Sequence, residues 1–121
     1  MKVLVIDDHP TVRQMATRLL AVLGHTPLEA RDADEAEAAL RANAGDLEVV
    51  LMDLCLDGCD GGTLARRLQE ARADLHILFM SGDGEEVFAA RDLAGPRRGF
   101  IEKPFSLNGL SSALEGLLAS R

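Results

Sequence analysis

The chain of 121 residues has no tryptophan or tyrosine, and only two of its residues, Cys55 and Cys59, are cysteines. Two cysteines are too few for the disulfide framework of a small secreted domain, so a cytoplasmic setting is expected. No apolar run approaches the roughly 20 residues of a membrane span. The first residues lack the long apolar core and cleavage site of a signal peptide. These absences argue against a secreted or membrane-spanning protein.

Positive charge is also scarce, with 13 Lys and Arg against 20 Asp and Glu and a net charge of −7. An acidic chain offers little basic surface to displace counterions, so neither nucleic acid nor an anionic membrane is expected as a direct partner. The composition, 47% hydrophobic and 27% charged, is that of a globular protein, and the length suits one domain. Lys2 and Lys103 are the only lysines among many arginines, which suggests a chemical reason for Lys103.

Short apolar runs alternate with segments of helical spacing along the whole chain. Strands are expected at residues 2–6, 25–30, 47–52, 75–80 and 99–102. Five helices are expected, starting near Pro10, Asp32, Gly62, Asp83 and Ser106. Pro27 cannot donate to a strand ladder and indicates that its strand lies at a sheet edge. Strict alternation of strand and helix predicts a doubly wound α/β fold, with a parallel sheet covered on both faces.

Polar side chains follow four of the five predicted strands: Asp7 and Asp8, then Asp53, Ser81 and Lys103. Ligands bind at the carboxyl ends of parallel strands, so these side chains are expected to meet at one rim. Converging carboxylates repel one another unless a cation lies among them, and Mg²⁺ prefers such oxygen ligands. With Lys103 and Ser81 nearby, the rim suits formation of an aspartyl phosphate, because cations neutralise the transferring phosphoryl group.

Four motifs, in this order, resemble those of the receiver domain of two-component response regulators: Val-Leu-Val-Ile-Asp7-Asp8, Leu-Met-Asp53, Phe79-Met80-Ser81-Gly82 and Lys103-Pro104-Phe105. The resemblance covers essentially the whole chain and is to receivers of the chemotaxis-regulator type. It implies a flavodoxin-like, three-layer (βα)5 fold with strand order 2-1-3-4-5. It also implies one receiver domain over residues 1–121, without an output domain. The Phe-Met-Ser-Gly and Lys-Pro-Phe-Ser segments are similar to those of receivers attached to hybrid histidine kinases.

The resemblance implies a phosphoacceptor and a metal site. Asp53 would accept the phosphoryl group from a histidine kinase or a histidine phosphotransfer protein. Asp8 would bind Mg²⁺, or Mn²⁺ as an alternative, directly, and Asp7 would bind it mainly through water. Asp53 and the main-chain carbonyl of Cys55 would complete the protein ligands.

The resemblance also implies a switch. Ser81 would hydrogen-bond the phosphoryl group, and Lys103, preceding a cis-Pro104, would pair with Asp53 or its phosphate. Phe100 would be the aromatic residue that turns inward when Ser81 moves. The readout face would be the fourth helix, fifth strand and fifth helix, roughly Gly84 to Ala119, where a downstream protein could dock.

Three departures from the family pattern bear on these expectations. Asp57 stands where the family often has proline, which affects the geometry and charge of the loop after Asp53. Cys55 and Asp83 occupy positions that tune the lifetime of the phosphoryl group in the family.

Alternative functions compete with the phosphoacceptor. The main one is a pseudo-receiver, the same fold used as a constitutive protein-binding module. A flavodoxin-like cofactor site would need a phosphate-binding loop after the first strand, where the chain has Asp-Asp-His-Pro. Phosphatase turnover is disfavoured because Asp53 and Asp57 do not form an Asp-x-Asp motif. The two cysteines are too few for a zinc site, and the three histidines, His9, His25 and His76, are scattered without a nucleophile beside them.

Overall fold

Five parallel strands form the central sheet of the protein. The computed structural model describes residues 1–56, 59–82, 95 and 97–119. The strands are β1 (Lys2–Ile6), β2 (Thr26–Ala30), β3 (Leu47–Asp53), β6 (His76–Ser81) and β7 (Arg98–Glu102). Their order is β2-β1-β3-β6-β7, and every neighbouring pair is parallel. The predicted fold class and strand order are therefore confirmed, with the Pro27-containing strand β2 at one edge.

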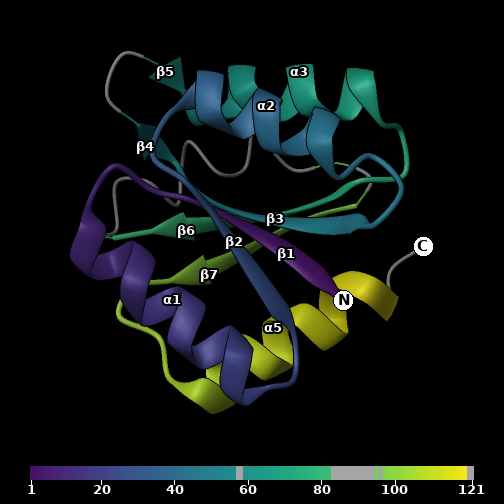
Figure 1. The fold of residues 1–121 in the computed structure, drawn as a ribbon. Helices are drawn as coiled ribbons and strands as arrows, with labels where there is room; N and C mark the ends of the chain where they lie inside the picture. The colour runs from purple at the N-terminus through teal and green to yellow at the C-terminus, as the bar shows by residue number, and fades with distance from the viewer. Residues whose placement is uncertain (57–58, 83–94, 96, 120–121) are drawn as a thin grey trace.

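Helices cover both faces of this sheet (Figure 1). They are α1 (Pro10–Val22), α2 (Ala33–Ala42), α3 (Gly61–Ala71) and α5 (Leu107–Ala119). Figure 1 shows α2 and α3 on one face and α1 and α5 on the other, which gives three layers. The helix predicted to start at Asp83 lies outside the described residues. Among the described helices, none has the length and apolarity to cross a bilayer.

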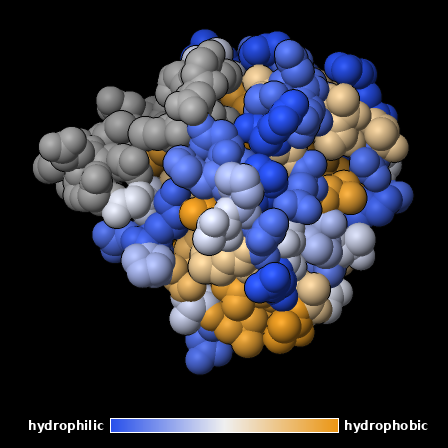
Figure 2. Space-filling model, turned by 60° about the vertical axis from the view of Figure 1, so that its left-hand side comes forward, coloured by the Kyte–Doolittle hydropathy of each residue, from blue (hydrophilic) through white to orange (hydrophobic). Residues whose placement is uncertain are grey.

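The alternation of side chains along the strands divides the core into two halves. On β1, Leu4 and Ile6 belong to the half beneath α2 and α3, whereas Val3 and Val5 belong to the half beneath α1 and α5. Because both faces are covered, the central strands are apolar at almost every position, as the sequence predicted. On the face shown in Figure 2, hydrophilic residues predominate and hydrophobic residues gather in a patch at its lower edge.

Local sequence signals start and stop the helices where they were expected. Pro10 occupies the first turn of α1, and Gly24, with a φ of 89°, follows its end. Asp32 caps α2 by accepting a hydrogen bond from the Glu35 N–H at 2.9 Å. Ser106 caps α5 in the same way, accepting from the Gly109 N–H at 3.0 Å. The Lys103–Pro104 peptide is cis, as the family resemblance implied.

The segment after Asp53 differs from the sequence prediction, which had no strand between Asp53 and the helix starting near Gly62. Two short strands, β4 (Cys55–Leu56) and β5 (Cys59–Asp60), pair antiparallel there. Helix α3 then begins at Gly61, and the Gly61 N–H donates to the Leu54 carbonyl at 3.2 Å. Sequence reasoning missed this ribbon because two-residue strands are too short to show a hydrophobic period.

Replacement of Gly61 even by alanine is expected to destabilise the protein. A Cβ there would lie 2.8 Å from the Leu54 carbonyl oxygen and 3.0 Å from the Asp53 carbonyl oxygen, and backbone atoms cannot move aside cheaply. We expect Gly61→Ala to lower the free energy of unfolding by about 1–3 kcal/mol, the usual cost of forcing atoms into a packed site. Urea denaturation followed by circular dichroism measures it.

Gly116→Ala provides the matched control for that prediction. Gly116 is an exposed residue within α5, and an added Cβ would meet nothing within 4 Å. The same substitution should therefore stabilise the protein by about 1 kcal/mol through helix propensity alone. Equal stability of Gly61→Ala and the parent protein would show that the close approach at Gly61 is unimportant.

Candidate functional site

The carboxyl ends of the strands are tied together by backbone hydrogen bonds. The Asp7 N–H, after β1, donates to the Ala30 carbonyl of β2 at 3.1 Å. The Leu54 N–H, after β3, donates to the Met80 carbonyl of β6 at 3.1 Å. The Lys103 N–H, after β7, donates to the Ser81 carbonyl at 2.6 Å. These bonds bring the predicted site residues to one rim of the sheet.

Three carboxylates converge at this rim. Asp7 is fully buried, Asp53 is 3% exposed, and Asp8 is partly exposed. Carboxylate oxygens of Asp7, Asp8 and Asp53, with a ring nitrogen of His9, lie within 4.8 Å of one another. Burial of carboxylates at this density is costly unless positive charge compensates them. The rim is therefore a strong candidate for cation binding.

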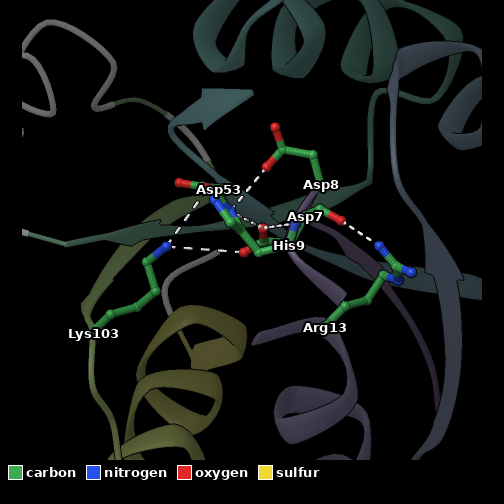
Figure 3. A network of polar contacts seen from close by, with 6 residues as sticks. All are labelled: Asp7, Asp8, His9, Arg13, Asp53 and Lys103. Atoms are coloured by element: carbon green, nitrogen blue, oxygen red, sulfur yellow. Dashed lines mark hydrogen bonds and ion pairs between the residues drawn. The ribbon is translucent and has the colours of Figure 1, made fainter. Parts of the chain in front are cut away.

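Lys103 supplies positive charge next to the carboxylates of Asp53 and Asp7. Its Nζ lies 3.5 Å from Oδ2 of Asp53 and 3.9 Å from Oδ2 of Asp7. Figure 3 shows the side chain reaching from the end of β7 toward both carboxylates. The chemical reason suspected for this lysine is thus consistent with its position, because its ammonium group faces the two most buried acids.

His9 also belongs to the cluster, although the sequence analysis set it aside. Its Nδ1 lies 3.1 Å from Oδ1 of Asp7 and 3.0 Å from Oδ1 of Asp8. The hydrogen bond with Asp7 and the negative charges of Asp8 and Asp7 raise the pKa of the His9 imidazole above its ordinary value. The signal that could have identified it is adjacency, since His9 directly follows the Asp7–Asp8 pair.

Arg13 is a second residue that sequence reasoning missed. Its Nη1 donates to the main-chain carbonyl of Asp7 at 2.8 Å, as Figure 3 shows. Its Nε donates to Oε1 of Glu29 at 3.0 Å. In the sequence Arg13 is one arginine among many on an amphipathic helix, so only the folded chain distinguishes it.

The residues at the rim fit a hard divalent cation. Oδ2 of Asp7 is buried and accepts no hydrogen bond from the described residues, so this oxygen has coordination capacity left. The donor set of three carboxylates is the oxygen-rich chemistry that Mg²⁺ and Mn²⁺ prefer. Cys55 begins β4 two residues after Asp53, so its main-chain carbonyl belongs to the same segment.

The two predicted switch residues lie on neighbouring strands. Ser81 is the last residue of β6 and is 5% exposed. Phe100 on β7 is 37% exposed, and its ring stacks on that of buried Phe79, with centroids 5.4 Å apart and planes 20° from parallel. The aromatic ring therefore lies partly in solvent, supported by a core residue of the adjacent strand.

Comparison with known proteins gives consistent matches over nearly the whole chain. Residues 3–115 match the family described as "Response regulator receiver domain". The chain is 34% identical over 116 residues to "Sensor kinase CckA" of Brucella abortus, covering 96% of this chain and 12% of that protein. It is 33% identical over 118 residues to "Phosphate regulon transcriptional regulatory protein PhoB" of Pseudomonas aeruginosa, covering 96% of this chain and 51% of that protein.

A solved structure supports the same relationship. The crystal structure of the receiver domain of NtrX from Brucella abortus superposes with a TM-score of 0.84 at 31% identity, covering 98% of this chain and 99% of that one. The chain spans only 12% of CckA and 51% of PhoB, so it is similar to one segment of each of these relatives.

Proposed function

Because this chain belongs to the response regulator receiver domain family, we propose that it takes a phosphoryl group from a phosphohistidine onto Asp53 in a Mg²⁺-dependent reaction. The observation that carries the proposal is the convergence of Asp7, Asp8 and Asp53, with Lys103 3.5 Å from the Asp53 carboxylate. Membership of the family by itself implies a phosphoacceptor switch in a two-component system, and the residue roles are the finer proposal.

The chemical step is a displacement at phosphorus. A carboxylate oxygen of Asp53 attacks the phosphorus atom in line with the donor imidazole. A P–O bond forms as the P–N bond breaks, and the electron pair of that bond returns to the imidazole nitrogen. The Lys103 ammonium, next to Asp53, stabilises the charge that spreads over the phosphoryl oxygens.

The metal would be held by Asp8 directly, by Asp7 mainly through water, and by Asp53 and the main-chain carbonyl of Cys55. Bound Mg²⁺ supplies further positive charge to the transferring phosphoryl group. Lys103 cannot replace it, because the single charge of one ammonium group is less than the charge of the three clustered carboxylates and the incoming phosphoryl group.

Phosphorylation would then bias a two-state equilibrium of the domain. Ser81 donates its hydroxyl to the phosphoryl group, and Phe100 moves inward from its partly exposed position on β7. The readout face would comprise β7 and α5, with residues between 84 and 94 that lie outside the described part. A downstream protein docking there would sense the state of Asp53.

The partners proposed follow from this chemistry. The donor would be a histidine kinase or a histidine phosphotransfer protein in the cytoplasm. Residues 1–121 would act as one receiver unit, with no part in direct nucleic-acid or membrane binding. Its own phosphorylation and slow dephosphorylation would be the reactions it catalyses, as a switch and without turnover of a separate substrate.

The test is intact-mass measurement after incubation with acetyl phosphate and Mg²⁺. We expect a mass gain of one phosphoryl group, abolished by EDTA, and calorimetric titration should show Mg²⁺ binding in the absence of the phosphodonor. A protein that binds neither Mg²⁺ nor beryllofluoride would contradict the proposal and favour the pseudo-receiver, a constitutive protein-binding module of the same fold. Binding of beryllofluoride without a mass gain would retain the switch and restrict the donor to a phosphohistidine protein.

A further inference from the structure

The turn that carries Asp7 and Asp8 is anchored to the edge strand β2. The Asp7 N–H donates to Ala30 at the end of β2. The Asp7 carbonyl accepts from Nη1 of Arg13, and Nε of the same guanidinium donates to Glu29 of β2. The Asp7 N–H is therefore bonded to β2 directly, and the Asp7 carbonyl is linked to β2 through Arg13.

We propose that Arg13 is a positioning residue of the phosphorylation site, which holds the Asp7–Asp8 turn in its metal-binding geometry by bridging Asp7 to Glu29. The guanidinium is planar and rigid, so two donors pointing at separate acceptors fix its orientation. The Arg13 side chain is only 18% exposed, which limits competition from water for its part-buried bond to the Asp7 carbonyl, whereas the Glu29 carboxylate is 48% exposed.

The position of Arg13 in the chain makes the bridge stiff. Its own N–H donates to the His9 carbonyl at 3.1 Å and closes the first turn of α1. The His9 N–H in turn donates to Oδ1 of Asp7 at 2.9 Å. Backbone and side-chain bonds thus close a small loop from Asp7 through His9 to Arg13 and back to Asp7. Loss of the Arg13 side chain would open this loop at the Asp7 carbonyl.

A charge effect and a positioning effect of Arg13 predict opposite changes in Mg²⁺ affinity when its side chain is removed. A guanidinium cation near the site repels a divalent cation, so if Arg13 acted only through its charge, its removal would tighten Mg²⁺ binding. If Arg13 positions Asp7 and Asp8, its removal weakens binding. Loss of groups that orient metal ligands costs about 10- to 100-fold in affinity, which exceeds the opposing effect of one partly screened charge.

The experiment compares Arg13→Ala and Arg13→Lys with the parent protein and with Arg18→Ala. Arg18 is an exposed arginine on the same helix, so Arg18→Ala makes the same charge change away from the rim. We expect Arg13→Ala to raise the Kd for Mg²⁺ about 10-fold by calorimetry. Arg13→Lys should resemble Arg13→Ala, because one ammonium group cannot hold both acceptors in a fixed geometry. Arg18→Ala should bind like the parent.

Hydrogen exchange of the metal-free proteins gives an independent readout. The amides of Asp7 and His9 are both bonded within the anchored turn, at 3.1 Å to Ala30 and 2.9 Å to Asp7. We expect them to exchange several-fold faster in Arg13→Ala, while amides in the centre of β3 stay unchanged. The effects of Arg13→Ala and Glu29→Ala on these exchange rates should be markedly less than additive in the double variant, since both substitutions remove the same bridge.

The Mg²⁺ measurement rests on the function proposed above, whereas the exchange measurement does not. If the parent protein binds no Mg²⁺, the proposed function fails and exchange alone decides the role of Arg13. Mg²⁺ binding by Arg13→Ala that equals or exceeds that of the parent would overturn the positioning role. Exchange of Asp7 and His9 that matches the parent would overturn it as well. An Arg13→Lys protein with parental Mg²⁺ affinity would show that one cationic donor is sufficient, which would overturn the role of the two-acceptor bridge to Glu29.

Discussion

Asp53→Asn is expected to abolish phosphorylation by acetyl phosphate completely, with no mass gain over hours in Mg²⁺. The amide that replaces the carboxylate is a poor nucleophile and a weaker metal ligand, so both requirements of the step are lost together. Asp53 is also the only carboxylate of the rim within 3.5 Å of Lys103 among the described residues. The neighbouring acids therefore cannot take over its position relative to the ammonium group.

The control for Asp53→Asn is Asp46→Asn, which makes the same chemical change at the opposite end of the sheet. Asp46 is exposed and pairs with Lys2, 3.3 Å away, at the start of β1. We expect the Asp46→Asn protein to be phosphorylated to the same extent as the parent protein. Phosphoryl incorporation that persists in Asp53→Asn at the parental rate would place the acceptor elsewhere in the chain.

Lys103→Met is expected to have two effects of opposite sign. The rate of phosphorylation should fall about 10²- to 10³-fold, the usual cost of removing a group that stabilises developing charge. Affinity for Mg²⁺ should rise, because the ammonium group at 3.5 Å from Asp53 and 3.9 Å from Asp7 repels a divalent cation. Stopped-flow or quenched mass measurements give the rate, and calorimetry gives the affinity.

Lys2→Met is the matched control, because Lys2 is the only other lysine of the chain. It lies at the amino end of β1, where it contacts Asn43 and Asp46. Neither the rate nor the Mg²⁺ affinity should change in this variant. If Lys103→Met lowered the rate and also weakened Mg²⁺ binding, the lysine would serve to hold the carboxylates in place and not to stabilise the transferring group.

The residues at the strand ends could be predicted from the sequence, whereas their neighbours His9 and Arg13 could not. Five site residues were predicted because each comes after a predicted strand, and strand ends can be located from hydrophobic period. They are Asp7, Asp8, Asp53, Ser81 and Lys103. Their convergence follows from parallel strand geometry, which places all carboxyl ends on one rim. The measured distances add the pairing of Lys103 with Asp53 and Asp7 in particular.

His9 and Arg13 were not predicted, although both contact Asp7. A histidine after an acidic pair and an arginine on a helix occur in many solvent-exposed settings, so local pattern does not distinguish them. Arg13 acquires its position only when α1 packs beside β2, which brings Glu29 within 3.0 Å across 16 residues of sequence. The ribbon of β4 and β5 and the close approach at Gly61 likewise depend on how segments meet.

The sequence by itself determined the α/β class, the strand order through the family resemblance, and the chemistry of the rim. These are properties of hydrophobic period and residue type, which are local and are read along the chain. Only the tertiary structure decided which groups lie within hydrogen-bond distance of Asp7 and where α3 begins after Asp53. Those facts depend on how closely atoms of different segments approach one another, to within a few tenths of an ångström. Packing of the helices against the sheet sets these distances.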